Sequence, residues 1–301
     1  MGSEMCIRDS PVMEELAWYL FTSGTTGMPK AVKSRYRSQL LTAEGIFRVA
    51  APCSREDVFY SPLPLNHVWG LIIFCGAMLT GSKIVLRRRF SAGKYWDEVR
   101  ENNATVGAYI GEIPRYLYNA PARPDDGENP MHRFVGLGLK ADLWEKFRER
   151  FAIDEIVEVY GASEGGSPLI NIAGVPGMVG RIFNPAAAAL AKYDMDAGRF
   201  ELDENGFMIR CTEPGDQGVY VVSKDDPGTN INDYTDAKAN SEKVLRDVFE
   251  KGDAWFNSGD LFRIHEDGWL SYQDRLGDTF RWKSENVSTQ EVESILMGFP
   301  E

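Results

Sequence analysis

Hydrophobic positions in this chain fall into two alternating patterns, short continuous runs and helical spacing. The continuous runs predict buried strands at 16–21, 57–60, 83–86, 105–110, 134–139 and 156–160. The helical spacing predicts amphipathic helices at 34–50, 71–79, 95–102 and 142–151. The repeating order of strand, turn and helix predicts an α/β fold, with a layered large domain built on a largely parallel sheet.

After about Ala188 the pattern changes to short strands separated by turns rich in Asp, Gly and Pro. A helix is expected at 236–249. Expected strands lie at 189–193, 200–202 and 218–222, and a hairpin joins 261–265 to 269–272. This pattern predicts a β-rich subdomain, a small barrel beside the first lobe.

These changes of pattern suggest four segments. Residues 11–187 are expected to form the α/β part and residues 188–273 the β-rich subdomain. Residues 274–301 are expected to be a hinge and the start of a further domain. The composition of residues 1–10 fits nothing that follows, and we expect them to be a non-native leader.

Composition narrows the classes of function. The chain is 43% hydrophobic and 26% charged, which is typical of a globular protein. Its formal net charge of -12 disfavours nucleic-acid binding, because affinity for phosphate backbones comes from clustered Lys and Arg. The four cysteines have no paired or metal-ligand spacing, which indicates reduced thiols and a cytoplasmic location. No apolar run is long enough for a transmembrane helix, so any membrane contact is expected to be peripheral, on the cytoplasmic face.

The first candidate for chemistry is the stretch 22–30, which ends in Lys30. Gly24 and Gly27 let backbone N–H groups turn toward an anion, and hydroxyl groups add further donors. Those hydroxyls belong to Thr22, Ser23, Thr25 and Thr26. This donor set is typical of a phosphate-binding loop. Pro29 before the lysine distinguishes it from the Walker pattern, and a polar turn after a strand is the alternative.

Later motifs carry further candidates, each with a structural alternative. Tyr160-Gly161-Ala162-Ser163-Glu164 follows a predicted strand, and Glu164 could simply complement a helix dipole. Asp260 in Ser-Gly-Asp could be a turn residue, and Arg275 could form a surface ion pair. His67 lies in a loop with two prolines and could be a packed histidine.

In this order the motifs resemble those of the adenylate-forming superfamily, which contains acyl-CoA synthetases, luciferases and peptide-synthetase adenylation domains. The resemblance runs from about Leu16 to the C-terminus. Within it, residues 109–117 and 277–289 are similar to the fatty-acid transport protein and very-long-chain acyl-CoA synthetase branch. The resemblance implies two steps. A carboxylate attacks the α-phosphate of ATP to give acyl-AMP and pyrophosphate, and coenzyme A then displaces AMP.

The resemblance also implies roles for single residues. Lys30 and His67 would act on the phosphates and the reacting carboxylate, and Glu164 would help to hold Mg²⁺, which prefers oxygen ligands. Tyr160 would lie against adenine, and Asp260 would accept from the ribose hydroxyls. The full set assigned to nucleotide and acyl binding is Thr22, Ser23, Gly24, Thr25, Thr26, Gly27, Gly138, Tyr160, Gly161, Ala162, Ser163, Asp260 and Arg275.

Three positions depart from the family pattern. Ser163 stands where threonine is usual and keeps the hydroxyl, whereas Asn66 replaces a tyrosine common before the histidine. Ser284 replaces a glycine in the hinge region, where a side chain could hinder the thioester step. Family members also carry a segment before the phosphate loop and a small mobile C-terminal domain, and we expect this chain to lack that domain. We therefore expect this chain to contain the nucleotide site but to show little or no catalytic turnover.

The leading interpretation is an ATP-dependent ligase that joins long- or very-long-chain fatty acids to coenzyme A. A second enzyme interpretation changes only the acid, to carnitine, crotonobetaine or a bile acid. A different class is a non-catalytic lipid-uptake protein on the same fold. The combined residues for phosphate, magnesium and ribose favour the enzyme, because a lipid binder needs none of them.

Overall fold

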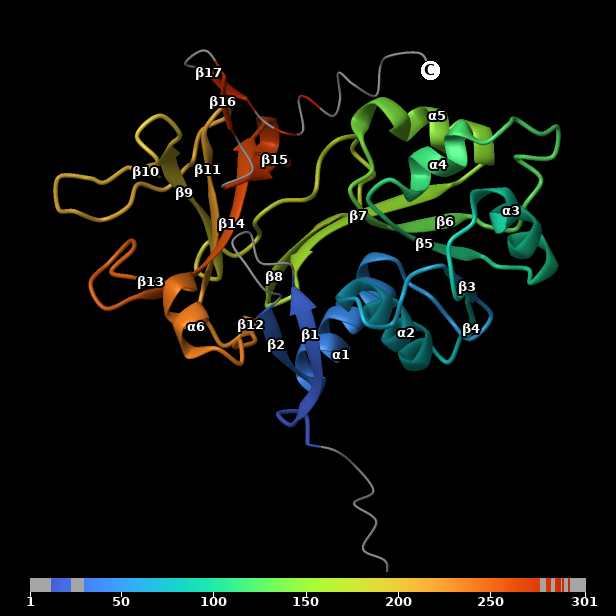
Figure 1. Cartoon of the computed structure of the whole chain (residues 1–301), viewed down its shortest axis with the longest axis horizontal. Helices are drawn as coiled ribbons and strands as arrows, with labels where there is room; N and C mark the ends of the chain where they lie inside the picture. Colours follow the sequence, from blue (N-terminus) through green and yellow to red (C-terminus); the bar gives the residue numbers. More distant parts are fainter. Residues whose placement is uncertain are drawn as a thin grey trace, which may run out of the picture.

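Two β-sheets stand side by side in the computed structural model, which describes residues 12–22, 30–276, 280–282, 285–287, 289 and 292. The seven-stranded sheet, with helices on both faces, lies on the right of Figure 1, and the six-stranded antiparallel sheet lies on the left. The predicted α/β fold with a β-rich subdomain is therefore confirmed.

The seven-stranded sheet has the order β12-β8-β7-β6-β5-β3-β4. Its parallel part consists of β3 (Val58–Ser61), β4 (Lys83–Leu86), β5 (Val106–Ile110), β6 (Arg133–Leu137) and β7 (Glu155–Ala162). Two antiparallel strands extend it, β8 (Gly165–Asn171) and β12 (Asn230–Ile231). β12 comes from the segment predicted to be the β-rich subdomain, so that segment contributes one strand to the seven-stranded sheet. The predicted domain boundaries remain predictions.

Helices cover both faces of this sheet, as Figure 1 shows. One face carries α1 (Tyr36–Glu44), the π-helix η1 (Gly45–Ala50) and α2 (Val68–Thr80). The other carries α3 (Ala92–Glu101), α4 (Ile113–Asn119) and α5 (Ala141–Phe151). No helix within the described ranges is both long and apolar enough to cross a membrane.

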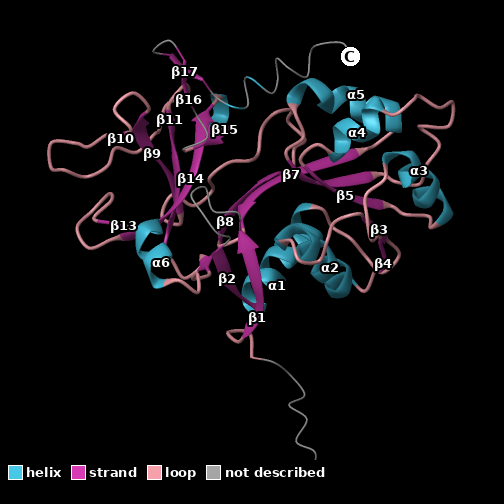
Figure 2. Ribbon diagram, in the orientation of Figure 1, coloured by secondary structure: helices cyan, strands magenta, loops and turns pink. Residues whose placement is uncertain are grey.

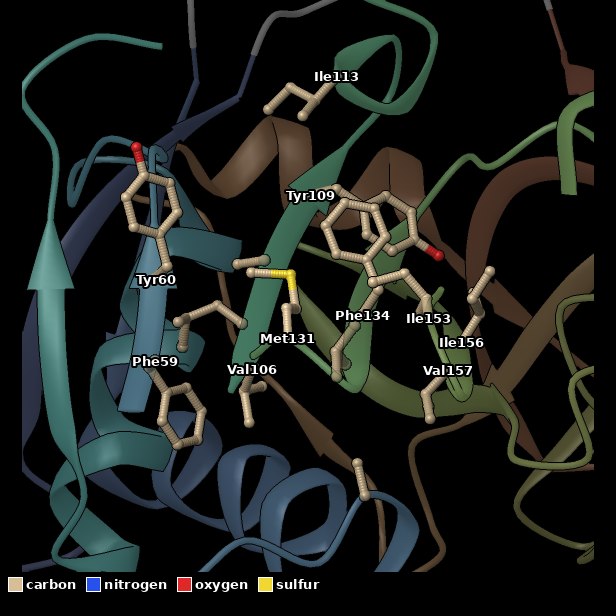
Figure 3. Close-up of a cluster of buried hydrophobic side chains, with 14 of the residues drawn as sticks. Phe59, Tyr60, Val106, Tyr109, Ile113, Met131, Phe134, Ile153, Ile156 and Val157 are labelled. Carbon is tan, nitrogen blue, oxygen red and sulfur yellow. The ribbon is translucent and has the colours of Figure 1, made fainter. Parts of the chain in front are cut away.

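Aromatic rings fill the core between the sheet and α5. Figure 3 shows part of this core, with Tyr109 and Phe134 on the neighbouring strands β5 and β6. Phe134 stacks on Tyr109 at 4.4 Å and on Phe147 at 5.0 Å between ring centroids, and all three are fully buried. Burial of each such side chain stabilises the fold by about 1.5–3 kcal/mol. The sheet that carries the loops of the site is therefore a rigid platform.

The six-stranded sheet is antiparallel throughout, with the eleven-residue β14 at its centre. Its strands are β9 (Ala188–Asp194), β10 (Arg199–Phe200), β11 (Gln217–Ser223), β13 (Val244–Arg246), β14 (Ala254–Ile264) and β15 (Leu270–Arg275). The helix α6 (Ala237–Lys243) precedes β13, and the short 3-10 helix η2 (Glu266–Gly268) joins β14 to β15. The strands predicted at 189–193 and 218–222 and the hairpin are confirmed, whereas the strand predicted at 200–202 is the two-residue β10, which ends at Phe200.

A separate hairpin of β1 (Leu16–Thr22) and β2 (Lys30–Arg35) lies between the two sheets (Figure 2). A second small hairpin near the end of the chain pairs β16 (Phe280–Trp282) with β17 (Glu285–Val287). The first hairpin holds the two ends of the predicted phosphate loop, since Thr22 and Lys30 are paired across it.

The prediction that 16–21 is a buried strand is wrong in one respect. The segment is a strand, but Tyr19 is 55% and Phe21 is 69% exposed, and Leu20 is the buried residue of the run. Leu20 packs with Val32 and Leu71 on one face of the hairpin, whereas Tyr19 and Phe21 point to the opposite face, because successive side chains of a strand alternate.

Two helix boundaries differ from prediction because strand pairing takes the residues. The helix expected at 34–50 starts at Tyr36, since the residues before it pair with β1, and it ends in a π-helix. The helix expected at 236–249 ends at Lys243, because Val244–Arg246 pairs with β14. The pattern also missed α4, β2, β8 and β12.

Candidate functional site

The order of the parallel strands marks where a ligand would bind. The chain passes from β3 outward to β4 and then returns to place β5 on the other side of β3. Ligands of open α/β sheets bind at the carboxyl ends of the strands, where the order reverses in this way. The loops at these ends contain His67 after β3, Gly138 after β6 and Glu164 after β7. Residues predicted from separate motifs therefore meet at one edge.

A polar cleft of about 450 Å³ opens between the two sheets at this edge. Both sheets and the β1–β2 hairpin contribute to its lining. The lining residues are Leu20, Phe21, Thr22, His67, Val68, Gly161, Ala162, Ser163, Glu164, Ser258, Asp260 and Arg275. The structure thus brings eight of the residues predicted for the site to one cleft, from segments far apart in the sequence.

An apolar pocket of about 240 Å³ adjoins the polar cleft. Ile72, Ile110, Leu137 and Val159 form much of its wall, between α2 and the sheet. It shares His67, Val68, Gly161, Ala162 and Ser163 with the polar cleft. A ligand with an anionic end and an apolar body could therefore occupy both at once.

A third pocket, called here the Gly138 pocket, lies beside Tyr160 and Tyr272. Gly138 has φ +87°, a conformation that residues with a Cβ rarely adopt. Its backbone N–H donates to the buried carboxyl group of Glu158, which fixes the turn after β6. The predicted glycine is therefore required by the backbone at this position.

Asp260 links the two sheets through Tyr160. The Tyr160 hydroxyl donates to Asp260 Oδ2 at 2.5 Å, although the residues lie one hundred positions apart. Burial raises the pKa of Asp260, and the Tyr160 hydroxyl, Arg275 and Lys243 act to lower it. Arg275 faces Asp260 across the β14–β15 ladder. Asp260 therefore lies in a strand and not in the turn that we considered for it. Arg275 lines the cleft with Asp260 and, within the described residues, does not form the surface ion pair that we considered.

Glu164 occupies a two-residue turn between β7 and β8, so it does not cap a helix. Its side chain is 7% exposed, and its Oε1 accepts from the hydroxyl of Tyr234. Its Oε2 has no hydrogen-bond partner among the described residues. A single carboxylate beside a phosphate site fits Mg²⁺, which is usually held by one or two carboxylates and by substrate phosphates. The described ranges contain no cluster of three metal-ligating side chains.

His67 is the N-cap of α2, and its Nδ1 accepts from the backbone N–H of Trp69 at 3.2 Å. Partial burial lowers the pKa of His67, which favours the neutral ring near pH 7. Because Nδ1 accepts, the proton of the neutral ring is on Nε2. His67 therefore offers an N–H donor at the junction of the polar cleft and the apolar pocket.

Lys30 lies at the base of the predicted phosphate loop. Its Nζ is 3.7 Å from Glu242 Oε2, on α6, and the Thr22 hydroxyl donates to its carbonyl oxygen at 3.4 Å. Further residues named from the sequence lie outside the described residues: the loop residues Ser23, Gly24, Thr25, Thr26 and Gly27, and the hinge residue Ser284. Thr22 and Lys30 mark where the loop begins and ends.

Sequence reasoning missed Glu158, which is 3% exposed. Its carboxyl group also accepts from the Tyr109 hydroxyl at 2.5 Å and from Leu139 N at 3.2 Å. Burial raises its pKa to about 8, although these donors lower it. The signal was present, since Glu158 is the charged residue inside the apolar run 156–160. Sequence reasoning also missed Tyr234 and Lys243, because neither is a polar residue that interrupts an apolar run.

Comparison with known families and proteins extends this description. A model of the AMP-binding enzyme family matches residues 4–203. Medium/long-chain-fatty-acid–CoA ligase FadD6 of Mycobacterium tuberculosis is 39% identical over 284 residues, which cover 94% of this chain and 47% of that protein. Long-chain fatty acid transport protein 1 of Homo sapiens is 39% identical over 296 residues, which cover 94% of this chain and 45% of that protein. The chain thus spans about half the length of the curated relatives it matches.

Solved structures with the same fold are more distant in sequence. O-succinylbenzoate coenzyme A synthetase (MenE) from Bacillus subtilis, in complex with ATP and magnesium ion, superposes with a TM-score of 0.72 at 23% identity. The match covers 95% of this chain and 56% of that one. ATP-bound MatB from Rhodopseudomonas palustris gives a TM-score of 0.72 at 24% identity, covering 96% and 54%. These matches establish the fold.

Proposed function

We propose, from the premise that this chain belongs to the AMP-binding enzyme family, that it carries the adenylation site of an AMP-forming acid–thiol ligase for long- or very-long-chain fatty acids. The observation that carries the proposal is the junction of the polar cleft and the apolar pocket at His67. A fatty acid has an anionic end and an apolar chain, and this junction suits both. The names of two relatives, a medium/long-chain-fatty-acid–CoA ligase and a long-chain fatty acid transport protein, agree with it.

In the first step, a carboxylate oxygen of the acid attacks the α-phosphorus of ATP and the bond to the β-phosphate breaks. Acyl-AMP forms and pyrophosphate leaves. Such a step needs alignment and neutralised charge rather than a covalent protein intermediate. The loop 22–30 would hold the β- and γ-phosphates through backbone N–H groups, hydroxyls and Lys30. The Nε2–H of His67 would donate to the carboxylate or the α-phosphate.

The nucleoside would occupy the other side of the cleft. Adenine would enter the Gly138 pocket against Tyr160, and the Asp260 carboxylate would accept from the ribose hydroxyls. Arg275 would offset the charge of Asp260 and of the phosphate. Glu164 would hold Mg²⁺ together with phosphate oxygens; when bound, Mg²⁺ supplies neutralising charge for the departing pyrophosphate. In the second step the thiol of coenzyme A would attack the acyl carbonyl, and AMP would leave.

The test of this site is ATP–pyrophosphate exchange dependent on a fatty acid, measured on the protein in its full natural length. We expect Lys30→Ala, Glu164→Ala and Asp260→Ala each to lower exchange by about a hundredfold or more, since each removes charge stabilisation at the reacting phosphates or the ribose. Lys238→Ala, on the exposed side of α6, is the control and should leave exchange unchanged. Near-normal exchange in a variant would remove that residue from the site.

A second candidate, uptake of fatty acid without catalysis, is favoured by the name of the human relative. A panel of acids separates the alternatives. Exchange with palmitate or longer acids supports the fatty-acid ligase, and exchange only with carnitine, crotonobetaine or a bile acid supports a different ligase. Fatty-acid binding with no exchange, and with an affinity that ATP does not alter, would support the carrier and contradict the ligase.

A further inference from the structure

Lys243 is the last residue of α6, and it contacts Ser258, which lines the polar cleft. Its Nζ donates to the carbonyl oxygen of Ser258 at 3.0 Å and lies 5.8 Å from the ring centroid of Phe256. Its helix neighbours differ: Lys238 is 83% exposed and lies 3.9 Å from Glu242. Lys243 therefore directs its ammonium group inward, toward β14.

The carbonyl that Lys243 contacts belongs to a bulge in β14. Val219 pairs with Leu261 and Val221 pairs with Asn257, so the single residue Tyr220 faces the three residues 258–260. A bulge changes the direction of a strand and can re-aim a side chain. Gly259 has φ +80°, and a Cβ built on it would lie 3.3 Å from Lys243 Nζ. The ammonium group is thus packed directly against the bulge that presents Asp260.

Hydrogen bonds hold the rest of the bulge from the opposite strand. The Ser258 hydroxyl donates to the Tyr220 carbonyl at 2.7 Å and accepts from Asp260 N at 3.0 Å. The bond from Lys243 adds a charged donor to the Ser258 carbonyl, and bonds with a charged partner are the stronger ones. Both contacts act at Ser258, two residues before Asp260, so Tyr220 and Lys243 together fix the backbone that leads into Asp260.

The charged groups that interact with Lys243 belong to the proposed nucleotide site. Its pKa is lowered, first by burial, and the charged groups that influence it are Glu164, Arg275, Asp260 and Lys30. Within the described chain no carboxylate oxygen lies within 4.0 Å of its Nζ. Removing an ammonium group from water costs free energy that a single neutral carbonyl does not fully offset. Lys243 is also one of the two cations that lower the pKa of Asp260.

We propose that Lys243 is a positioning residue of the nucleotide site: through the Ser258 carbonyl it holds the 258–260 bulge and so keeps the Asp260 carboxylate aimed at the ribose. The inference rests on the proposed function, in which Asp260 accepts from the ribose hydroxyls. Lys243 does not line the cleft itself, so it acts on the nucleotide only through Asp260.

The test compares AMP with 2′,3′-dideoxy-AMP, which lacks the hydroxyls that Asp260 would bind. Equilibrium affinities are measured for the 301-residue chain and for Lys243→Met, Lys243→Gln and Lys238→Met, with thermal unfolding recorded for each. We expect Lys243→Met to weaken AMP about tenfold and dideoxy-AMP less than about twofold, because a bond to a charged group is lost at the bulge. Lys238→Met removes the same charge from the exposed face of α6 and should alter neither affinity.

The outcomes separate the two proposals. A wild-type chain with no preference for AMP over the dideoxy nucleotide overturns the proposed function and this inference with it. A clear preference that survives unchanged in Lys243→Met overturns the inference alone, as does an equal loss for both nucleotides. If Lys243→Met does not fold, Lys243→Gln decides, because its shorter, uncharged side chain removes the charged donor from the Ser258 carbonyl; full AMP preference in that variant counts against Lys243.

Discussion

The two sheets supply the cleft in different ways. The seven-stranded sheet contributes the loops that follow its parallel strands, with His67, Gly138 and Glu164 at successive carboxyl ends. The six-stranded sheet contributes side chains from within its ladder, where Asp260 and Arg275 face each other on neighbouring strands. The first sheet therefore shapes the site through backbone turns, and the second through strand register.

Each sheet also holds a carboxyl group that accepts from a tyrosine hydroxyl, and these two groups, buried Glu158 and half-buried Asp260, differ in how fully they are bonded. Glu158 accepts from Tyr109 on its own sheet and from the backbone N–H groups of Gly138 and Leu139. Asp260 accepts from Tyr160, on the other sheet, and lines the open cleft. A fully bonded carboxyl group stabilises structure, whereas one with free acceptor capacity can bind a ligand.

The largest effect that separates the two regions is expected from core aromatic residues. Phe134→Ala and Phe262→Ala should each lower the free energy of unfolding by about 3–5 kcal/mol, because each removes a fully buried ring. Phe262 contacts Tyr160 at 4.7 Å and Tyr272 at 5.6 Å between ring centroids, so its loss should also weaken AMP binding. Phe134→Ala should lower stability with little change in AMP affinity.

Denaturant unfolding and AMP titration below the midpoint measure these two quantities. An equal loss of AMP affinity in Phe134→Ala and Phe262→Ala would show that the cores of the two sheets do not differ in their effect on AMP binding. Phe249, which packs on Trp255 at 5.0 Å on the six-stranded sheet, is a control within the same region. Its replacement by Ala should leave AMP affinity unchanged.

The next effect concerns pH. The pKa of Glu158 is raised by burial to about 8 from 4.5, so the folded state binds more protons than the unfolded chain between these values. The contribution of Glu158 to stability is full below about pH 4.5 and is lost as pH rises through about 8, with a slope of at most about 1.4 kcal/mol per pH unit. Glu158→Gln should remove this slope.

Unfolding free energies measured from pH 5 to 8 provide the check. Asp260→Asn, the matching change on the other sheet, should flatten the profile less, because Tyr160, Arg275 and Lys243 partly offset the effect of burial on its pKa. If the unfolding free energy of the wild-type protein varied with pH in the same way as that of Glu158→Gln, the raised pKa of Glu158 would be contradicted.

The smallest effect is expected from the two tyrosine hydroxyls. Tyr109→Phe removes the side-chain donor to the buried Glu158 carboxyl group, leaving only the backbone donors of Gly138 and Leu139, and should lower the free energy of unfolding by about 1–3 kcal/mol. Tyr160→Phe should cost less, because water in the cleft can reach Asp260 in place of the hydroxyl. Thermal unfolding of both variants tests this order, and a larger loss in Tyr160→Phe would reverse our view of which carboxyl group is structural.

Particular residues show how far sequence reasoning reached. The apolar runs at 134–139 and 156–160 placed β6 and β7 correctly, and the glycines and acids after them mark the loops of the cleft. Lys243 was hidden inside the helix predicted at 236–249, which in the structure ends at Lys243. Its role depends on the pairing of Val244–Arg246 with β14, which no local pattern specifies.

Periodicity and motif order determined the fold class, the strands of the parallel sheet and most residues that now line the cleft, because buried runs and glycine turns are local properties of the chain. Tertiary structure alone decided which of these residues meet. The bond from Tyr160 to Asp260 and the bulge held by Lys243 depend on strand register between segments far apart in the sequence. Register follows from packing across the whole sheet, which a local pattern does not contain.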